Sequence, residues 1–292
     1  MPELRALASY YGGALWVAEA RGRVVGMIAT RPLSNGDSTG TWEICRVYAH
    51  PDQHGAGLGH ALLDRAEAYA AQHGARRLTL WTDTRFDRAH RFYEKRSYVR
   101  AGRIRVLHDL SHSLEFAYAK PLSGVERLDA AGASSAERRL SDILVACVDD
   151  GASVSFLPPL AASRAAAFWR QASSQVATGS RLLLAGWRNG VLAGCVSLDL
   201  GTPENQPHRA EVQKLLVHPQ YRRTGLAGQL MARAEGEART MGRTLLTLDT
   251  RADDAAAILY RRTGWIEAGR IPSFALDATG VPRDTLLLWK RL

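Results

Sequence analysis

The sequence predicts an α/β (α+β) protein with two tandem domains, each a mixed, mainly antiparallel sheet flanked by helices. Three observations support this prediction. The chain has 292 residues, more than one hydrophobic core usually serves. Two long stretches, starting at Thr41 and Arg209, resemble each other in the same order. Each stretch changes between strand-like and helix-like spacing of its apolar residues, as expected for a sheet covered by helices.

The two stretches indicate a duplicated domain, because a solenoid has shorter and more numerous repeats. The aligned pairs are two acidic residues, a His-Pro step, a glycine and a tyrosine: Glu43 with Glu211, Asp83 with Asp249, His50-Pro51 with His218-Pro219, Gly57 with Gly225, and Tyr93 with Tyr260. The stretch Pro121–Gly124 is turn-like and is expected to join the copies. We therefore expect domains at 1–123 and 124–292.

The shared elements follow the same order in both copies. We expect a hairpin, a strand that ends at His-Pro, a Gly-rich turn, a long amphipathic helix, a strand, a short helix and a closing strand. In the first copy we expect the hairpin at 15–20 and 24–30, the strand at 42–49, the turn at 54–57, the long helix at 58–69, the next strand at 75–83, the short helix before 98 and the closing strand at 115–122. In the second copy we expect the hairpin at 182–187 and 191–200, the strand at 211–217, the turn at 221–225, the long helix at 226–238, the next strand at 243–249, the short helix before 265 and the closing strand at 284–292.

The copies differ at the front. Before its hairpin, the second copy has a predicted strand at 125–130 and predicted helices at 135–149 and near 160–178. The first copy has only about a dozen residues before its hairpin, so it lacks this strand and both helices.

Composition narrows the class of protein. With 46% hydrophobic and 23% charged residues, the chain has ordinary globular composition. No stretch approaches the roughly 18 apolar residues that span a bilayer, and the first residues lack a secretory pattern. The three cysteines form no metal or disulfide pattern. We expect a cytoplasmic protein that binds neither a membrane nor a metal. The even spread of its +9 charge argues against a nucleic-acid partner.

The Gly-rich turn of the second copy, Tyr221–Gly228, predicts a pyrophosphate site. The first N–H groups of a helix have no partner inside it, and the helix dipole favours an anion there. Small residues let a polyanion approach the backbone, and Arg222 and Arg223 add cations. The stretch lacks both the ATP-binding P-loop pattern and the dinucleotide fingerprint.

The whole pattern, including Arg222-x-x-Gly225-x-Ala227 after a strand and His-Pro, resembles the GNAT superfamily of acetyl-CoA-dependent N-acetyltransferases. Both halves show the resemblance, over nearly the whole chain. It implies tandem acyl-CoA N-acyltransferase domains with acetyl-CoA as cosubstrate and no metal. The residues that it places at the coenzyme in the second copy are Leu215, Leu216, Val217, Arg222, Arg223, Thr224, Gly225, Leu226, Ala227 and Gly228.

Within this superfamily the second half is similar to the tabtoxin resistance protein, an acetyltransferase that inactivates a toxin amine. The stretches 151–160, 209–219 and 248–250 show this similarity. It implies that Glu211 and Asp249 lie near the substrate amine and Tyr260 near the coenzyme sulfur. An alkylammonium, with a pKa of about 10.4, must lose a proton before it attacks, and a carboxylate can accept that proton. A phenol can protonate the departing thiolate.

Each of these residues also has a structural interpretation. Glu211 could be an exposed charge or a partner of Arg209 or Lys214, Asp249 could cap the next helix, and Tyr260 could belong to the core. The expected function is acetyl transfer by the second domain to a primary amine of a small molecule. The alternatives are a protein or peptide acceptor, and a non-catalytic module that senses acetyl-CoA or binds nucleic acid or protein.

The first copy allows three interpretations: a degenerate structural partner, an inactive coenzyme-binding or regulatory module, or a second active site. His54 stands where the second copy has Arg222, and the missing elements form one wall of the acceptor site in the superfamily. Two fused domains fit either a pseudo-dimeric monomer or a homodimer. The weaker coenzyme candidates are Val47, Tyr48, Ala49, Gly55, Ala56, Gly57, Leu58, Gly59, His60 and Tyr93.

Overall fold

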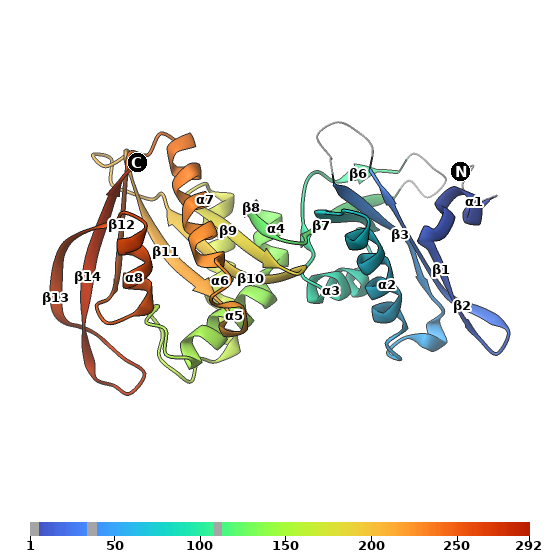
Figure 1. The fold of residues 1–292 in the computed structure, drawn as a ribbon, viewed down its shortest axis with the longest axis horizontal. Helices are drawn as coiled ribbons and strands as arrows, with labels where there is room; N and C mark the ends of the chain where they lie inside the picture. The colour runs from blue at the N-terminus through green and yellow to red at the C-terminus, as the bar shows by residue number, and fades with distance from the viewer. Residues whose placement is uncertain (1–5, 34–39, 108–112) are drawn as a thin grey trace. The chain divides into compact units, whose positions relative to one another are not determined.

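The computed structural model describes residues 6–33, 40–107 and 113–292 (Figure 1). The chain forms two compact units. One contains Met1–Tyr93 and Arg100–Ser123, and the other contains Glu94–Val99 and Gly124–Leu292. No helix in the described ranges has the length and apolar run needed to cross a membrane.

The second unit has a seven-stranded sheet in the order β13-β14-β12-β11-β10-β9-β8. Neighbouring strands are antiparallel except for the parallel pair β11·β12. The strands are β8 (Gly124–Leu128), β9 (Arg181–Arg188), β10 (Val191–Asp199), β11 (Arg209–Val217), β12 (Leu245–Arg251), β13 (Ile266–Leu276) and β14 (Pro282–Arg291). The helices are α4 (Ala130–Ser135), α5 (Glu137–Asp149), α6 (Ala162–Ala177), α7 (Leu226–Thr240) and α8 (Ala255–Arg262).

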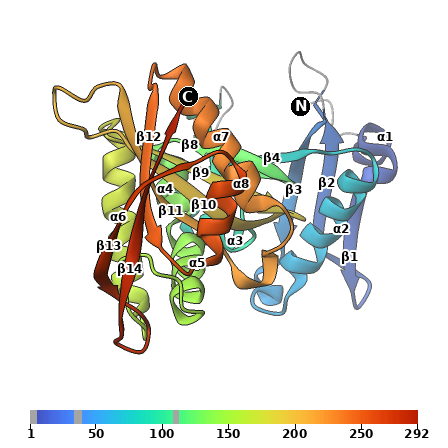
Figure 2. The same cartoon turned by 60° about the vertical axis from the view of Figure 1, so that its left-hand side comes forward.

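Helices cover both faces of this sheet, as Figures 1 and 2 show. Side chains alternate along β9, so that Leu183 packs with α4, α5 and α6 while Leu182 and Leu184 pack with α7 and α8. Both clusters are almost fully buried, which explains why β9 and β10 read as continuous apolar runs.

Two glycines lie where α7 packs on the sheet. A Cβ added to Gly186 would lie 2.7 Å from Leu226 Cδ1 on α7, and one added to Gly194 would lie 3.3 Å from Leu226 Cδ2 and 2.6 Å from the backbone oxygen of Leu216 on β11. A side chain at Gly194 would collide with backbone, whereas one at Gly186 would push the end of the Leu226 side chain aside. The close packing fixes where the N-terminus of α7 stands relative to β11.

The first unit repeats this arrangement with a sheet in the order β1-β2-β3-β4-β7-β5, with β6 also paired to β7. Strands β3 and β4 are its parallel pair. The strands are β1 (Leu15–Ala20), β2 (Arg23–Pro32), β3 (Thr41–Ala49), β4 (Arg77–Asp83), β5 (Val99–Arg100), β6 (Arg105–Val106) and β7 (Leu114–Pro121), and the helices are α1 (Leu7–Tyr11), α2 (Leu58–Gln72) and α3 (Asp87–Lys95).

The predicted fold class is confirmed, with differences at a few elements. The strand predicted at 125–130 ends at Leu128, because Asp129 accepts a hydrogen bond of 2.7 Å from Gly132 N and begins α4. The helix predicted at 135–149 is therefore the separate helix α5, which starts at Glu137. Strand β13 was not predicted as a strand, because nearly all its residues are exposed and it shows no alternation.

Candidate active site

A cleft opens where β11 and β12 part. Their parallel register covers only Arg209–Glu211 opposite Leu245–Thr247, although β11 continues to Val217 and β12 to Arg251. Lys214 has a left-handed backbone with φ of 54°, and the β10·β11 register shifts beside it. This bulge turns the end of β11 away from β12, so its backbone N–H and C=O groups on that side are available to a ligand.

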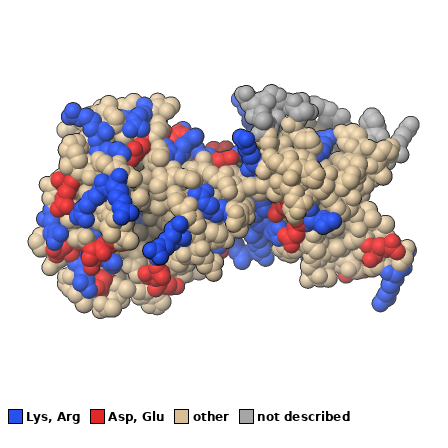
Figure 3. All heavy atoms as spheres, viewed as in Figure 1, with Lys and Arg blue, Asp and Glu red and all other residues tan. Residues whose placement is uncertain are grey.

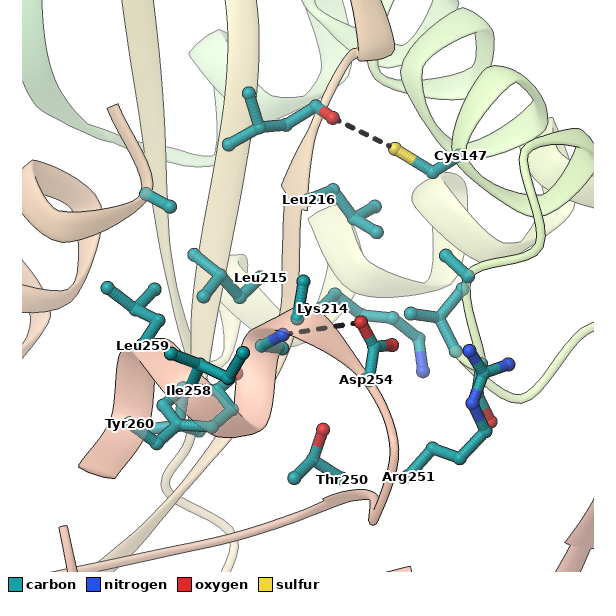
Figure 4. A pocket seen from close by; sticks show the side chains of 18 of the residues that line it. Cys147, Lys214, Leu215, Leu216, Thr250, Arg251, Asp254, Ile258, Leu259 and Tyr260 are labelled. Carbon is teal, nitrogen blue, oxygen red and sulfur yellow. Dashed lines mark hydrogen bonds between the residues drawn. The ribbon is translucent and has the colours of Figure 1, made fainter. Parts of the chain in front are cut away.

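The cleft forms a cavity of about 1040 Å³. It is lined by β11, β12, the segment after α5, the turn before α7, α8 and the β13–β14 hairpin. Figure 4 shows Leu215, Leu216, Thr250 and Tyr260 around it. The predicted residues that it brings together are Glu211, Leu215, Leu216, Val217, Arg222, Arg223, Gly225, Leu226, Ala227, Gly228, Asp249 and Tyr260.

The turn before α7 fits a pyrophosphate. His218 Nδ1 accepts a hydrogen bond of 3.3 Å from Gln220 N, and Gly225, with φ of 79°, begins the helix without a side-chain cap. A Cβ at Gly225 or Gly228 would meet nothing within 4 Å. The first N–H groups of α7 are therefore open to an anion of the size of a diphosphate.

Two predicted coenzyme residues have other partners in this turn. Arg222 forms an ion pair with Asp150, just after α5, and its Nε donates to Val217 O at 3.4 Å. Thr224 does not line the cavity, and its hydroxyl donates to Tyr221 O at 2.8 Å. Both side chains hold the shape of the turn, so the groups that it leaves open to an anion are mainly backbone N–H groups.

The two candidate carboxylates lie on adjacent strands at the cleft. Glu211, with a 38% exposed side chain, accepts a hydrogen bond of 3.0 Å from Gln213 Nε2. Its other oxygen lies 3.8 Å from Arg209 NH1, so the interpretation of Glu211 as a partner of Arg209 is confirmed as a long ion pair. Arg181 NH2 donates to the same amide's Oε1 at 3.0 Å, so a buried arginine orients Glu211 through Gln213. Asp249 is exposed and accepts a bond of 3.4 Å from Thr285 Oγ1.

Helix α8 is capped by Asp254, whose carboxylate accepts a bond of 3.2 Å from Ala256 N. The interpretation of Asp249 as that cap is therefore wrong. Tyr260 on α8 belongs to the core, as its structural interpretation predicts, since it is only 6% exposed. It also lines the cavity, and its role near the coenzyme sulfur stays a prediction. Burial, with Asp254 and Asp249 nearby, raises the pKa of its phenol well above the usual range.

The side chain of Lys214 also faces this cavity, although the sequence alone does not predict Lys214 as a site residue. Its Nζ donates to Ser155 Oγ at 3.2 Å and lies 5.4 Å from the centre of the Phe168 ring. The sequence shows Lys214 only as one polar position in a strand. The bulge that directs it into the cavity is a tertiary feature, because left-handed backbone at a lysine has no sequence signal.

The first copy has the same backbone geometry with different side-chain pairing. Arg46 takes the place of Lys214 with φ of 56°, and Gly57 begins α2 with φ of 83°. Glu43, with a 10% exposed side chain, is bound by Arg31 at 2.6 Å.

Two further polar candidates of the first copy, Asp83 and Tyr93, are also paired or enclosed. Arg85 binds both carboxylate oxygens of Asp83, at 2.9 and 2.6 Å. These bonds lower the pKa of Asp83 to about 2. Tyr93 is buried, which raises its pKa to about 12. The carboxylates that correspond to Glu211 and Asp249 are therefore already bound by arginine.

A split parallel pair, a strand bulge and an uncapped helix N-terminus together define the acyl-CoA N-acyltransferase fold, present here in two copies. The model of the acetyltransferase (GNAT) family matches residues 1–98 and 153–265. The chain therefore belongs to this family. The predicted family, a family of acetyltransferases, is confirmed. The closer resemblance to the tabtoxin resistance protein stays a prediction.

Individual relatives are more distant. An uncharacterized N-acetyltransferase of Methanocaldococcus jannaschii is 33% identical over 82 residues, which are 27% of this chain and 36% of the relative. The match thus spans about a third of that protein. A putative acetyltransferase of Acinetobacter baylyi has a TM-score of 0.50 at 18% identity, over 59% of this chain and 93% of its own. A putative acetyltransferase of Salmonella typhimurium, solved with acetyl-CoA, has a TM-score of 0.49 at 20% identity, over 59% of this chain and 94% of its own.

Proposed function

We propose that the second domain moves acetyl from acetyl-CoA directly to a primary amine of a small molecule. The observation that carries the proposal is the cavity of about 1040 Å³, which joins the open N-terminus of α7 to two carboxylates and a buried phenol. Its volume is in the range of small-molecule sites. On the face of the second unit in Figure 3, basic and acidic side chains are interspersed, unlike a continuous basic surface for nucleic acid.

The coenzyme would be held by backbone groups. N–H groups at the start of α7, from Leu226 to Gly228, would bind its pyrophosphate, with Arg223 adding charge. The edge of β11 from Leu215 to Val217 would bind its pantetheine arm and orient the acetyl group. When bound, acetyl-CoA supplies a thioester carbonyl as the electrophile and a thiol as the leaving group.

The side chains would then move two protons. Glu211 or Asp249, directly or through water, would accept the proton of the acceptor ammonium so that its nitrogen lone pair is free. Tyr260 is protonated at neutral pH, as any phenol is, and burial raises its pKa further. Its hydroxyl would donate a proton to the leaving sulfur, and the second proton that the nitrogen loses as the amide forms would restore the phenol.

A direct transfer agrees with the state of the cysteines in this domain. Burial raises the pKa of both Cys147 and Cys195, so neither is poised to form a thiolate. Cys147 lines the cavity, but its Sγ donates to Val217 O at 3.4 Å. In a direct transfer neither Cys147 nor Cys195 would carry the acetyl group.

The duplication provides a matched test. We expect the wild-type chain to release CoA with amines drawn from amino acids, polyamines and amino sugars, measured with a thiol reagent. Asp249→Asn should lower kcat about 10²- to 10⁴-fold if it is the base, and Glu211→Gln should do so otherwise. Asp83→Asn, the corresponding change in the first copy, should leave kcat unchanged. Equal losses from Asp83→Asn and the second-copy variants, or turnover with peptides alone, would contradict the proposal.

A further inference from the structure

The cavity contains an ammonium group without a carboxylate partner. Lys214 Nζ is bonded to Ser155 Oγ and lies over the rings of Phe168 and Phe156, at 5.4 and 5.9 Å from their centres. Within the described ranges of the chain, no Asp or Glu oxygen lies within 4.0 Å of it. Figure 4 shows Lys214 among the side chains that line the cavity.

The surroundings of this ammonium disfavour an isolated charge. Burial lowers the pKa of Lys214, and the buried guanidinium of Arg181 lowers it further. Asp249 and Glu211 are near enough to oppose this shift, but they do not cancel it. A part-buried cation without a carboxylate partner loses some of its hydration, and an anion bound beside it would offset that loss.

Three other cations that line the cavity, Arg222, Arg251 and Arg283, are already paired with carboxylates. Arg251 Nε binds Asp253 at 2.7 Å, and Arg283 Nε binds Asp277 at 2.8 Å. Lys214 therefore differs from them in having its charge available to a ligand. The same cavity also contains the two carboxylates that would receive an ammonium.

We propose that Lys214 binds an anionic group of the acceptor, so that the acceptor is an amino acid or a similar zwitterion. The inference rests on the proposed function. Glu211 and Asp249 would bind the ammonium end and accept its proton, while Lys214, with the Ser155 hydroxyl beside it, would bind the carboxylate or phosphonate end. An amine that lacks the anion would leave Lys214 unpaired and would bind more weakly.

The test compares acceptors that differ only in the anion. We would measure kcat/KM for three pairs: L-phenylalanine and phenethylamine, L-lysine and cadaverine, and β-alanine and ethylamine. The wild-type enzyme should prefer the acid of its best pair by roughly ten- to a hundredfold, as one charged hydrogen bond in a part-buried site provides. Lys214→Met should reduce this preference to below about threefold, through a higher KM for the acid. Lys214→Arg should retain most of it.

Lys95→Met is the matched control, because Lys95 is an exposed lysine at the end of α3. It should behave as wild type. The inference is overturned if the wild type uses the amines as well as the acids, or if Lys214→Met keeps the preference.

Calorimetry with CoA present separates this inference from the proposed function. If no acceptor releases CoA, the proposed activity fails for these amines, and binding alone decides the role of Lys214. Binding of an acid to the wild type that Lys214→Met abolishes would still support the inference. Equal binding to both proteins, or no binding to either, would overturn it.

Discussion

Replacing Gly228 by glutamate should block the coenzyme without harming the fold. Gly228 lies in the first turn of α7, and a Cβ there would meet nothing within 4 Å. In the free protein we expect a gain of about 0.5–1 kcal/mol from replacing a helical glycine, and a further few tenths from an acidic side chain near the helix N-terminus. The melting temperature without ligand should therefore stay level or rise by about 2–4 °C.

With coenzyme, the same carboxylate would stand where the pyrophosphate binds. Two unit charges 4 Å apart repel by about 4 kcal/mol at an effective dielectric constant of 20, and part exposure reduces this to about 2–3 kcal/mol. The Kd for acetyl-CoA should rise roughly 30- to 140-fold. At a concentration 100 times the wild-type Kd, ligand stabilisation should fall from about 2.7 kcal/mol to below about 1 kcal/mol.

Gly236→Glu provides the control. Gly236 is in the same helix and also has open space around a Cβ, but it lies eight residues further along α7. It should gain the same helix propensity and keep the full acetyl-CoA shift in melting temperature. If Gly228→Glu keeps that shift, or if Gly236→Glu loses it equally, the assignment of the α7 N-terminus to the pyrophosphate is wrong.

Three further predictions concern single residues. Tyr260→Phe should lower kcat at least tenfold with little change in the KM for acetyl-CoA, and an unchanged kcat would remove its role as the acid. The pKa of Asp83 is about 2 in the folded state and about 3.9 in the unfolded state. Its contribution to stability should therefore be complete above about pH 4 and lost as pH falls through about 2. Melting curves of Asp83→Asn should lack this pH dependence. Gly194→Ala, whose Cβ would lie 2.6 Å from Leu216 O, should cost about 1–3 kcal/mol in denaturant unfolding, whereas Gly236→Ala should cost nothing.

The sequence predicts the repeated framework well because periodicity and turn residues determine it locally. The spacing of Leu226, Leu230, Ala234 and Ala238 predicts α7, and all four are buried. The His218-Pro219 step predicts the end of β11, which stops at Val217.

The details of the site depend on long-range contacts that no local pattern records. Asp150 binds Arg222 across 72 residues, and Ser155 meets Lys214 across 59. The α8 cap falls on Asp254 and not on Asp249, because β12 runs on to Arg251 before the helix begins. Each of these follows from how strands and loops pack, so a candidate residue can be identified from sequence before its partner can.

The left-handed backbone of Lys214 implies a local compromise between stability and selectivity. A residue with a Cβ costs about 1–2 kcal/mol in this conformation relative to the usual one, and glycine avoids that cost. Lys214, with φ of 54°, is therefore a position where glycine should give a more stable domain with a less discriminating pocket. Arg46 carries the same strain in the first copy, but its side chain bonds to Tyr11 and Tyr48, so the loss of those bonds would offset what a glycine there gains.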